Sequence, residues 1–188
     1  MDNTLFKGEL VRLAAPDPET DAEIVARWSR DSEFMRLFGA GPTRPWPVKG
    51  VREDIEKNSE KSDVFVFHLR ALADNRLIGV TDIAPEWTHG DGWIGLGLGE
   101  REDWGKGYGT DAMRVMLRFA FTELNLYRVS LDVFEYNPRA IRSYEKAGFV
   151  FEGRMRQWMR RDGRRWDFVY MGILREEWER VSGQQVCK

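Results

Sequence analysis

Residues 92–149 limit the folds open to this chain more than any other stretch. Residues 92–98 form a strand-like run, a glycine-rich segment follows, and residues 110–124 have the apolar content of a largely buried helix. A second strand is predicted at residues 128–134 and a second helix at residues 138–147. A strand–helix–strand unit is a crossover connection, so it places two parallel strands in one sheet.

The segments on either side of this unit resemble a meander of antiparallel strands. Strand patterns fall at residues 8–13, 64–72, 77–83, 149–161 and 164–174. An Asp-Gly pair joins the last two strands and is a strong hairpin signal. Helical patterns fall at residues 17–30, 31–38 and 49–61. A crossover set within a meander predicts a mixed sheet covered by helices.

Length and composition fit one soluble domain. The chain has 188 residues, of which 42% are hydrophobic and 32% charged, which argues against both disorder and a membrane protein. The N-terminus lacks a signal-peptide pattern, so we expect a cytoplasmic location. We interpret residues 1–188 as a single domain with its core at about residues 8–178. The polar tail after Trp178 is predicted to fray.

Residues that usually carry metal or thiol chemistry are few. Cys187 is the single cysteine and lies in the polar tail, which excludes a disulfide framework and a Cys-based zinc cluster. His68 lies in an apolar strand-like run and His89 in a turn, and neither has metal-motif spacing. We therefore expect no metal. A net charge of −2 argues against a broad surface for nucleic acid.

The glycine-rich segment at residues 104–110 reads Trp-Gly-Lys-Gly-Tyr-Gly-Thr. Its glycines let backbone amides point into one concavity, and the following helix adds its free amides and its dipole. Lys106 could add charge at the rim, whereas Asp111 suits the dipole but not an added anion. The spacing fits neither the dinucleotide fingerprint nor the P-loop. Alone, the segment indicates either a phosphate site or a tight strand-to-helix turn.

A second motif begins at Asn137, a predicted N-cap, with Pro138 at the first helical position. Tyr144 follows seven residues after Asn137, which is nearly two helical turns, so both lie on one stripe with Ile141 between them. An amide and a phenol on one stripe could line a groove. The alternative is an ordinary amphipathic helix with a cap and a core tyrosine.

Residues 104–110 and residues 137–149 (Asn-Pro-Arg-Ala-Ile-Arg-Ser-Tyr-Glu-Lys-Ala-Gly-Phe) together resemble the GNAT superfamily of acetyl-CoA-dependent N-acetyltransferases. Within it, the chain is similar to the branch of the RimJ/RimL-type ribosomal-protein alanine acetyltransferases and the bacterial spermidine acetyltransferases. The resemblance covers about residues 8–178. It implies a mixed α/β (α+β) fold: a central, mostly antiparallel sheet of six to seven strands, with a splayed parallel pair and about four helices.

The resemblance also implies site residues. The splayed strands would admit the pantetheine arm of acetyl-CoA between residues 92–98 and 128–134, and Tyr144 would protonate the leaving thiolate. Trp104 stands where the family commonly has Gln or Arg. The residues implied to bind acetyl-CoA are Ile94, Leu96, Leu98, Trp104, Gly105, Lys106, Gly107, Tyr108, Gly109, Thr110, Asn137, Ile141 and Tyr144.

An amine must lose a proton before it attacks a thioester, because an alkylammonium has a pKa of about 10. A carboxylate or a water relay could remove it. The candidate bases are Glu135, which we place first, and Glu33, Asp82 and Glu86. In this branch the acceptor pocket is built from the first two helices, the loop after them and the last hairpin. The candidate acceptor-binding residues are Glu33, Phe38, Trp46 and Trp87.

The resulting prediction is direct transfer of acetyl from acetyl-CoA to a small-molecule primary amine in a ternary complex. Two alternatives stay open: an N-terminal, ribosomal-protein-type acetyltransferase, and a non-catalytic acyl-CoA-binding module. Arginines interleaved with tryptophans at residues 154–166 indicate either an acidic or RNA-bound partner or a solvated strand face. The expected partner is an amine or a peptide N-terminus, not a membrane or a nucleic acid, and the exposed hairpin is compatible with a homodimer.

Overall fold

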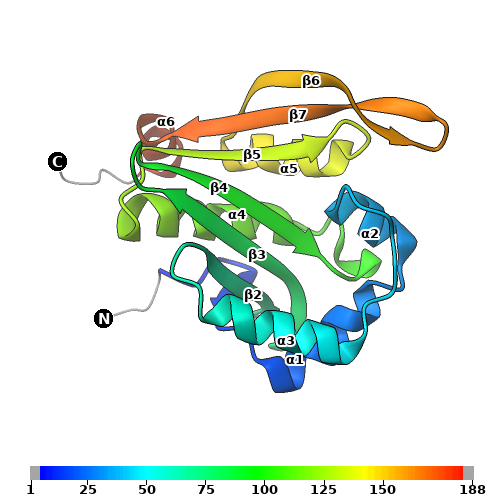
Figure 1. Ribbon diagram of the computed structural model, residues 1–188. Helices are drawn as coiled ribbons and strands as arrows, with labels where there is room; N and C mark the ends of the chain where they lie inside the picture. Colours follow the sequence, from blue (N-terminus) through cyan, green and yellow to red (C-terminus); the bar gives the residue numbers. More distant parts are fainter. Residues whose placement is uncertain (1–4, 184–188) are drawn as a thin grey trace.

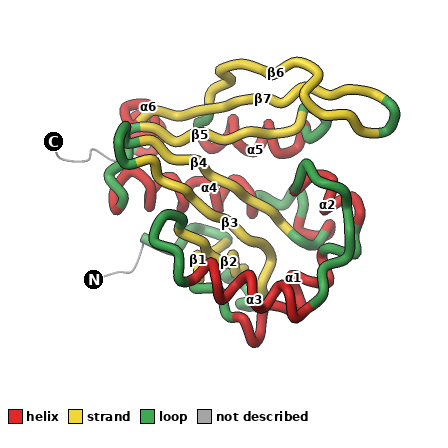
Figure 2. Tube along the Cα trace, viewed as in Figure 1, coloured by secondary structure: helices red, strands yellow, loops and turns green. Residues whose placement is uncertain are grey.

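A seven-stranded sheet forms the centre of the computed structural model, which describes residues 5–183 (Figures 1 and 2). The strands are β1 (Val11–Ala14), β2 (Phe65–Ala71), β3 (Leu77–Glu86), β4 (Asp91–Leu98), β5 (Arg128–Phe134), β6 (Val150–Arg161) and β7 (Arg164–Leu174). Their order in the sheet is β1-β2-β3-β4-β5-β7-β6. Neighbours run antiparallel except β4 and β5, which run parallel. This confirms the predicted mixed, mostly antiparallel sheet.

Helices cover both faces of the sheet (Figure 1). The helices are α1 (Pro18–Trp28), α2 (Ser32–Phe38), α3 (Val48–Ser59), α4 (Tyr108–Arg118), α5 (Pro138–Ala147) and α6 (Arg175–Ser182). One hydrophobic core joins α4, α5 and α6 to the sheet, and a second joins α1, α2 and α3 to the other face. The described chain thus has six α-helices, and the prediction of about four was too low.

The polar C-terminal segment is the clearest departure from the prediction. Instead of fraying, residues up to Ser182 continue as α6. Trp178 is 4% exposed, and its ring centroid lies 5.2 Å from that of Phe121. The Glu177 carboxylate accepts a hydrogen bond from the backbone N–H of Leu174 at 2.9 Å, which caps the helix start. One buried aromatic anchor therefore orders a segment whose composition is otherwise polar. Cys187 lies outside the described residues.

Local cap residues set the ends of α5. Asn137 Oδ1 accepts a hydrogen bond from Ala140 N at 3.2 Å, and Pro138 occupies the first turn. Gly148 ends the helix with φ at 107°, in the left-handed region that favours glycine. The helix predicted at residues 138–147 is confirmed with these bounds. The helix predicted at residues 110–124 begins earlier, at Tyr108, and its last part, Phe119–Glu123, has π-helical geometry.

No helix among residues 5–183 is both long enough and apolar enough to cross a membrane. 

Candidate active site

The sheet opens between its two parallel strands. The β4–β5 ladder has three residue pairs and ends at Trp93↔Ser130. Beyond it β4 stays paired to β3 as far as Leu98, and β5 stays paired to β7 as far as Phe134. Because each strand follows its own outer neighbour, a gap forms in the middle of the sheet.

The backbone of β4 faces this gap at alternate residues. Gly99 N donates to Ile78 O at 3.0 Å, and hydrogen-bonded pairs alternate along an antiparallel ladder. The backbone groups of Ile94, Leu96 and Leu98 therefore point toward β5. These are the three β4 residues that the family resemblance implies for pantetheine. Trp104 Nε1 donates to the Leu98 carbonyl at 2.9 Å and so occupies the last of these β4 carbonyl groups.

A cavity of about 980 Å³ passes through this gap. Leu96 and Tyr144 line it from the face covered by α4 and α5, and Asp82 and Phe38 line it from the opposite face. A cavity that opens to both faces gives two reactants separate routes to one point. Of the residues implied to bind acetyl-CoA, those that line it are Ile94, Leu96, Leu98, Trp104, Gly105, Gly107, Gly109, Thr110, Asn137 and Tyr144. Lys106, Tyr108 and Ile141 do not line it.

The three glycines beside the cavity serve two different purposes. Gly105 and Gly107 have φ of 78° and 93°, which glycine adopts at least cost. Gly107 is the N-cap of α4 and offers no side-chain cap, so the first amides of the helix remain available to an anion. Gly109 instead allows close approach of α5, since a Cβ there would lie 3.3 Å from Ser143 Oγ. Thr110 Oγ1 and Ser143 Oγ, 2.9 Å apart, join the two helices.

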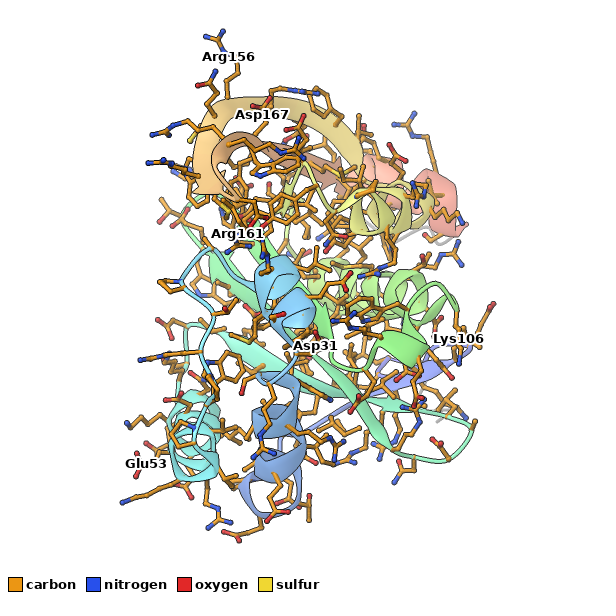
Figure 3. All side chains as sticks on the ribbon, turned by 90° about the vertical axis from the view of Figure 1, so that its right-hand side faces the viewer. Asp31, Glu53, Lys106, Arg156, Arg161 and Asp167 are labelled. Atoms are coloured by element: carbon orange, nitrogen blue, oxygen red, sulfur yellow. The ribbon has the colours of Figure 1, made fainter. Side chains whose placement is uncertain are left out.

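Cations gather around the glycine segment, but Lys106 is not the main one. Its side chain is exposed and points away from the molecule (Figure 3). The cavity is lined instead by Arg114, Arg139, Arg142 and Lys146. Three of these follow a spacing of three and four residues along α5, which places them on one stripe. That spacing is visible in the sequence and was the signal available for finding them.

Trp104 supports the glycine segment from one side. Besides its bond to Leu98, its ring stacks under the Arg139 guanidinium, whose carbon lies 3.8 Å from the ring centroid. Trp104 therefore also holds an arginine at the cavity wall. Burial lowers the pKa of Arg139 from its ordinary value, the direction expected for a cation partly removed from water.

The Asp111 carboxylate is occupied by backbone donors. Oδ1 accepts from Glu9 N at 3.1 Å, and Oδ2 accepts from Leu10 N and Val11 N at 2.8 and 2.9 Å. These bonds hold residues 9–11 across the start of α4, and β1 consequently begins at Val11 rather than at residue 8. The negative charge that seemed unsuited to a phosphate site is thus balanced by three N–H groups.

Tyr144 presents a buried phenol to the cavity. The side chain is 7% exposed, and its hydroxyl makes no hydrogen bond to another described residue. Burial, with a further contribution from the negative charge of Asp132, raises the pKa of Tyr144 to about 12. The phenol therefore keeps its proton at neutral pH and can act as a hydrogen-bond donor or an acid.

Asp82 and Asp132 line the cavity from β3 and β5, whereas two other carboxylates, Glu9 and Asp111, line it at the start of α4. Burial raises the pKa of Asp82 and that of Asp132 above the ordinary value. Asp132 is exposed, but to the cavity, whose protein walls still withdraw it from bulk water. The sequence alone did not indicate Asp132 as a candidate; its position two residues before the end of a splayed strand was the available signal.

The other candidate bases lie outside the cavity. Glu135 accepts a hydrogen bond from Asp167 N at 3.1 Å and lies 3.8 Å from an Arg154 guanidinium nitrogen. Glu33 forms an ion pair with Arg101 at 2.5 Å. Glu86 accepts from the backbone of the turn that follows it. Each carboxylate is therefore committed to a local partner.

Replacing Asp82 with asparagine is expected to raise the melting temperature at pH 7. The raised pKa means that the folded protein holds this proton more firmly than the unfolded chain. The protonated carboxyl therefore contributes to the free energy of unfolding at low pH. This contribution is lost as the pH rises from the pKa of Asp82 in the unfolded chain to its higher pKa in the folded protein, so ionised Asp82 destabilises the fold. The difference in melting temperature between Asp82→Asn and the wild type should disappear near pH 4. Thermal unfolding of both proteins at several pH values measures this difference. An Asp82→Asn variant less stable at pH 7 would contradict this.

The predicted acceptor residues separate into two groups. Phe38 lines the main cavity and also a second one, of about 710 Å³, which Trp46 lines as well. Glu33 and Trp87 line neither. Trp87 is 57% exposed in the turn between β3 and β4, at the end where β4 and β5 are still paired.

A buried polar group joins α1 to β2 beside the second cavity. His68 is 2% exposed, and its Nδ1 lies 2.6 Å from Asp21 Oδ2. Arg70 donates to the other Asp21 oxygen at 2.6 Å. Burial lowers the pKa of His68, so the ring is neutral at pH 7, while Asp21 acts in the opposite direction. Among the described residues, no group of three His, Cys, Asp or Glu side chains could hold a metal ion.

The β6–β7 hairpin reaches over α2. Arg161 donates to Arg36 O and Tyr136 Oη, both at 2.6 Å, and to Gly39 O at 3.3 Å (Figure 3). Arg36 and Asp162 add an ion pair. The contacts hold the loop after α2 beneath the hairpin. Arg156, in contrast, points away from the molecule (Figure 3).

Comparison with known proteins assigns this architecture to the acetyltransferases. Residues 11–150 match the model of the GNAT acetyltransferase domain, and the chain belongs to that family. The family transfers acetyl groups and uses acetyl-CoA as the donor, so the protein is an acetyltransferase.

Two relatives from Bacillus subtilis match nearly the whole chain. The SPbeta prophage-derived uncharacterized N-acetyltransferase YokL is 32% identical over 181 residues, covering 96% of this chain and 98% of the relative. The putative ribosomal N-acetyltransferase YdaF is 37% identical over 173 residues, covering 90% and 92%.

Solved structures share the fold. A spermidine N-acetyltransferase from Vibrio cholerae, in complex with CoA and spermine, aligns with a TM-score of 0.77 at 24% identity, covering 89% of this chain and 97% of that one. A GNAT-family acetyltransferase from Bacillus anthracis gives the same TM-score at 23% identity, covering 91% and 98%. At this identity the likeness concerns the fold alone.

Proposed function

We propose that the protein transfers acetyl directly from acetyl-CoA to the primary amine of a small molecule, with both substrates bound together. The observation that carries this is the cavity through the β4–β5 gap, lined by the glycine segment and Tyr144 on one face and by Asp82 on the other. The pyrophosphate would bind the amides of residues 105–109 and the arginines of α5. Pantetheine would pair with the free backbone of β4.

The chemistry follows from the residues at this gap. Asp82 or Asp132, directly or through a water, would take the ammonium proton, in place of Glu135, which lies outside the cavity. The neutral nitrogen then attacks the thioester carbon, and a β4 backbone N–H stabilises the oxyanion. When the carbon–sulfur bond breaks, Tyr144 would donate its proton to the sulfur. After the attack the nitrogen loses a second proton, which balances the one that Tyr144 gives to the sulfur and allows the phenol to be reprotonated. The first proton passes from the carboxylate to water.

A protein N-terminus is the second candidate acceptor, favoured by the exposed basic hairpin. Arg156, Arg160 and Arg164 are exposed near the acceptor face, where they could meet an acidic or RNA-bound target. Arg154 and Arg161 are occupied by Asp167 and by the loop after α2. The relative described as a putative ribosomal N-acetyltransferase is consistent with this second candidate.

Acetyl-CoA at about 100 times its Kd is expected to raise the melting temperature by about 5–10 °C, since it binds only the folded protein. CoA release should then be measured with polyamines, amino acids, aminoglycosides, simple alkylamines and peptides. Turnover only with peptides would select the second candidate. Tight binding without turnover of any amine would indicate a non-catalytic acyl-CoA-binding module. Absence of any thermal shift would refute the proposed function.

A further inference from the structure

The second cavity meets the first at Phe38 and Asp82, which line both. Its floor is one face of the sheet: Asp82 pairs with Val66 across β2–β3, and Val80 pairs with His68. Cross-strand partners lie on the same face. Gly95, paired with Asp82 on β4, lets the Asp82 carboxylate lie over β4, since a Cβ there would lie 2.7 Å from Asp82 Oδ1. The two cavities therefore adjoin at Asp82, beside the β4–β5 gap.

The walls of the second cavity are largely apolar. Trp46 and Phe38 form an edge-to-face pair with centroids 6.4 Å apart, and α3 contributes Val51 and Ile55. Val66 and Val80 complete the floor. A volume of about 710 Å³ lies within the range of sites for small organic ligands. These walls favour an acceptor with an apolar body rather than a chain of charged or polar groups.

Charged groups stand at the two ends of this cavity. Asp82 is half-buried at the junction, and it makes no ion pair or side-chain hydrogen bond with any residue between 5 and 183. Arg44, Asp54 and Lys61 are exposed residues that line the cavity, and none of the three has an ion-pair partner among the described residues. The junction is therefore negative, whereas the exposed rim carries two cations against one anion.

Resting on the proposed function, we propose that the second cavity is the acceptor pocket, and that it takes a primary amine with an apolar body and an anionic far end. Asp82 would bind the ammonium beside the gap, and Trp46 and Phe38 would cover the body. Arg44 and Lys61 would meet the far end. A polyamine would bring a second cation to a rim that is already positive, so it is disfavoured.

Three amines of equal chain length test this pocket, because they differ only in the group at the far end. They are 6-aminohexanoate (anionic), hexylamine (neutral) and 1,6-diaminohexane (cationic). We expect kcat/KM to fall in that order, with about a tenfold difference between the first and the last, as for partly exposed charge pairs. Acetylation of 1,6-diaminohexane faster than of 6-aminohexanoate would overturn the proposed acceptor class.

Variants at the rim and at the wall of the second cavity distinguish the effect of the rim charges from that of the apolar wall. The double variant Arg44→Ala/Lys61→Ala should lower kcat/KM for 6-aminohexanoate, lower it less for hexylamine, and raise it for 1,6-diaminohexane, because Asp54 then dominates the rim. The matched control is Arg30→Ala/Lys57→Ala, which removes two exposed cations that line neither cavity. Trp46→Ala should lower kcat/KM for all three amines by about tenfold.

Failure of this inference can be told apart from failure of the proposed function. If Trp46→Ala changes nothing while CoA release continues, the second cavity is not the acceptor pocket although the protein still acetylates amines. If no amine is acetylated, calorimetric titration of 6-aminohexanoate into the CoA-loaded protein shows whether the second cavity binds such an amine. Binding that Trp46→Ala weakens supports the pocket, and absence of binding overturns it.

Discussion

Replacing Tyr144 with phenylalanine is expected to lower kcat by about 100-fold or more, the usual contribution of a positioned general acid. The change removes one oxygen from a side chain that is 7% exposed and lines the main cavity. A thiol such as that of cysteine has a pKa of about 8.5, so a thiolate at neutral pH readily takes up a proton. The sulfur of CoA therefore leaves the tetrahedral carbon more readily when a proton is supplied. With the pKa of Tyr144 raised to about 12, the phenol holds that proton at the pH of the assay.

The same variant should bind acetyl-CoA normally. Its thermal shift with acetyl-CoA should equal that of the wild type, because the ring still contacts Phe149 and the glycine segment is unchanged. Tyr127→Phe is the matched control: it removes the same oxygen from a tyrosine that is 54% exposed and lines neither cavity. A wild-type kcat in Tyr144→Phe would show that another donor, such as water, protonates the sulfur.

Features with a local cause could be predicted from the sequence. Asn137, Pro138 and Gly148 fix the two ends of α5 by capping geometry alone. The hairpin between β6 and β7 follows from Asp162 and Gly163, whose φ of 53° and 76° both lie in the left-handed region. The crossover and its parallel strands follow from topology. The caps and the hairpin are readable because each depends on residues that are close together in the sequence, and the crossover because its strands and helix follow one another along the chain.

Features with a distant cause could not be predicted in this way. The choice among acidic side chains depends on which face of the sheet a residue occupies and on what covers it. Asp82 and Asp132 point into the cavity, whereas Glu135, on the same strand end as Asp132, is held by Asp167 N outside it. The order of α6 depends on Trp178 meeting Phe121, which is far away in the sequence. Periodicity does not carry that information.

Asp111 is the strongest case of such a distant cause, and replacing it with alanine is expected to destabilise the protein by about 3 kcal/mol. Its carboxylate accepts from the N–H groups of Glu9, Leu10 and Val11, about a hundred residues earlier in the chain. Val11 is fully buried, so its N–H would be left without a partner in the core. Thermal unfolding should show a fall of about 6–12 °C, as expected for a chain of this length.

Two further variants show whether the loss comes from these bonds. Asp111→Asn keeps one acceptor oxygen and should lose about half as much stability, whereas Glu123→Ala, at an exposed position, should change it by less than about 0.5 kcal/mol. The bonds also hold Leu10 close to Gly107, where both line the main cavity. The KM for acetyl-CoA should therefore rise in Asp111→Ala at temperatures where the variant is still folded. A destabilised Asp111→Ala with an unchanged KM would restrict Asp111 to the fold and separate it from the glycine segment.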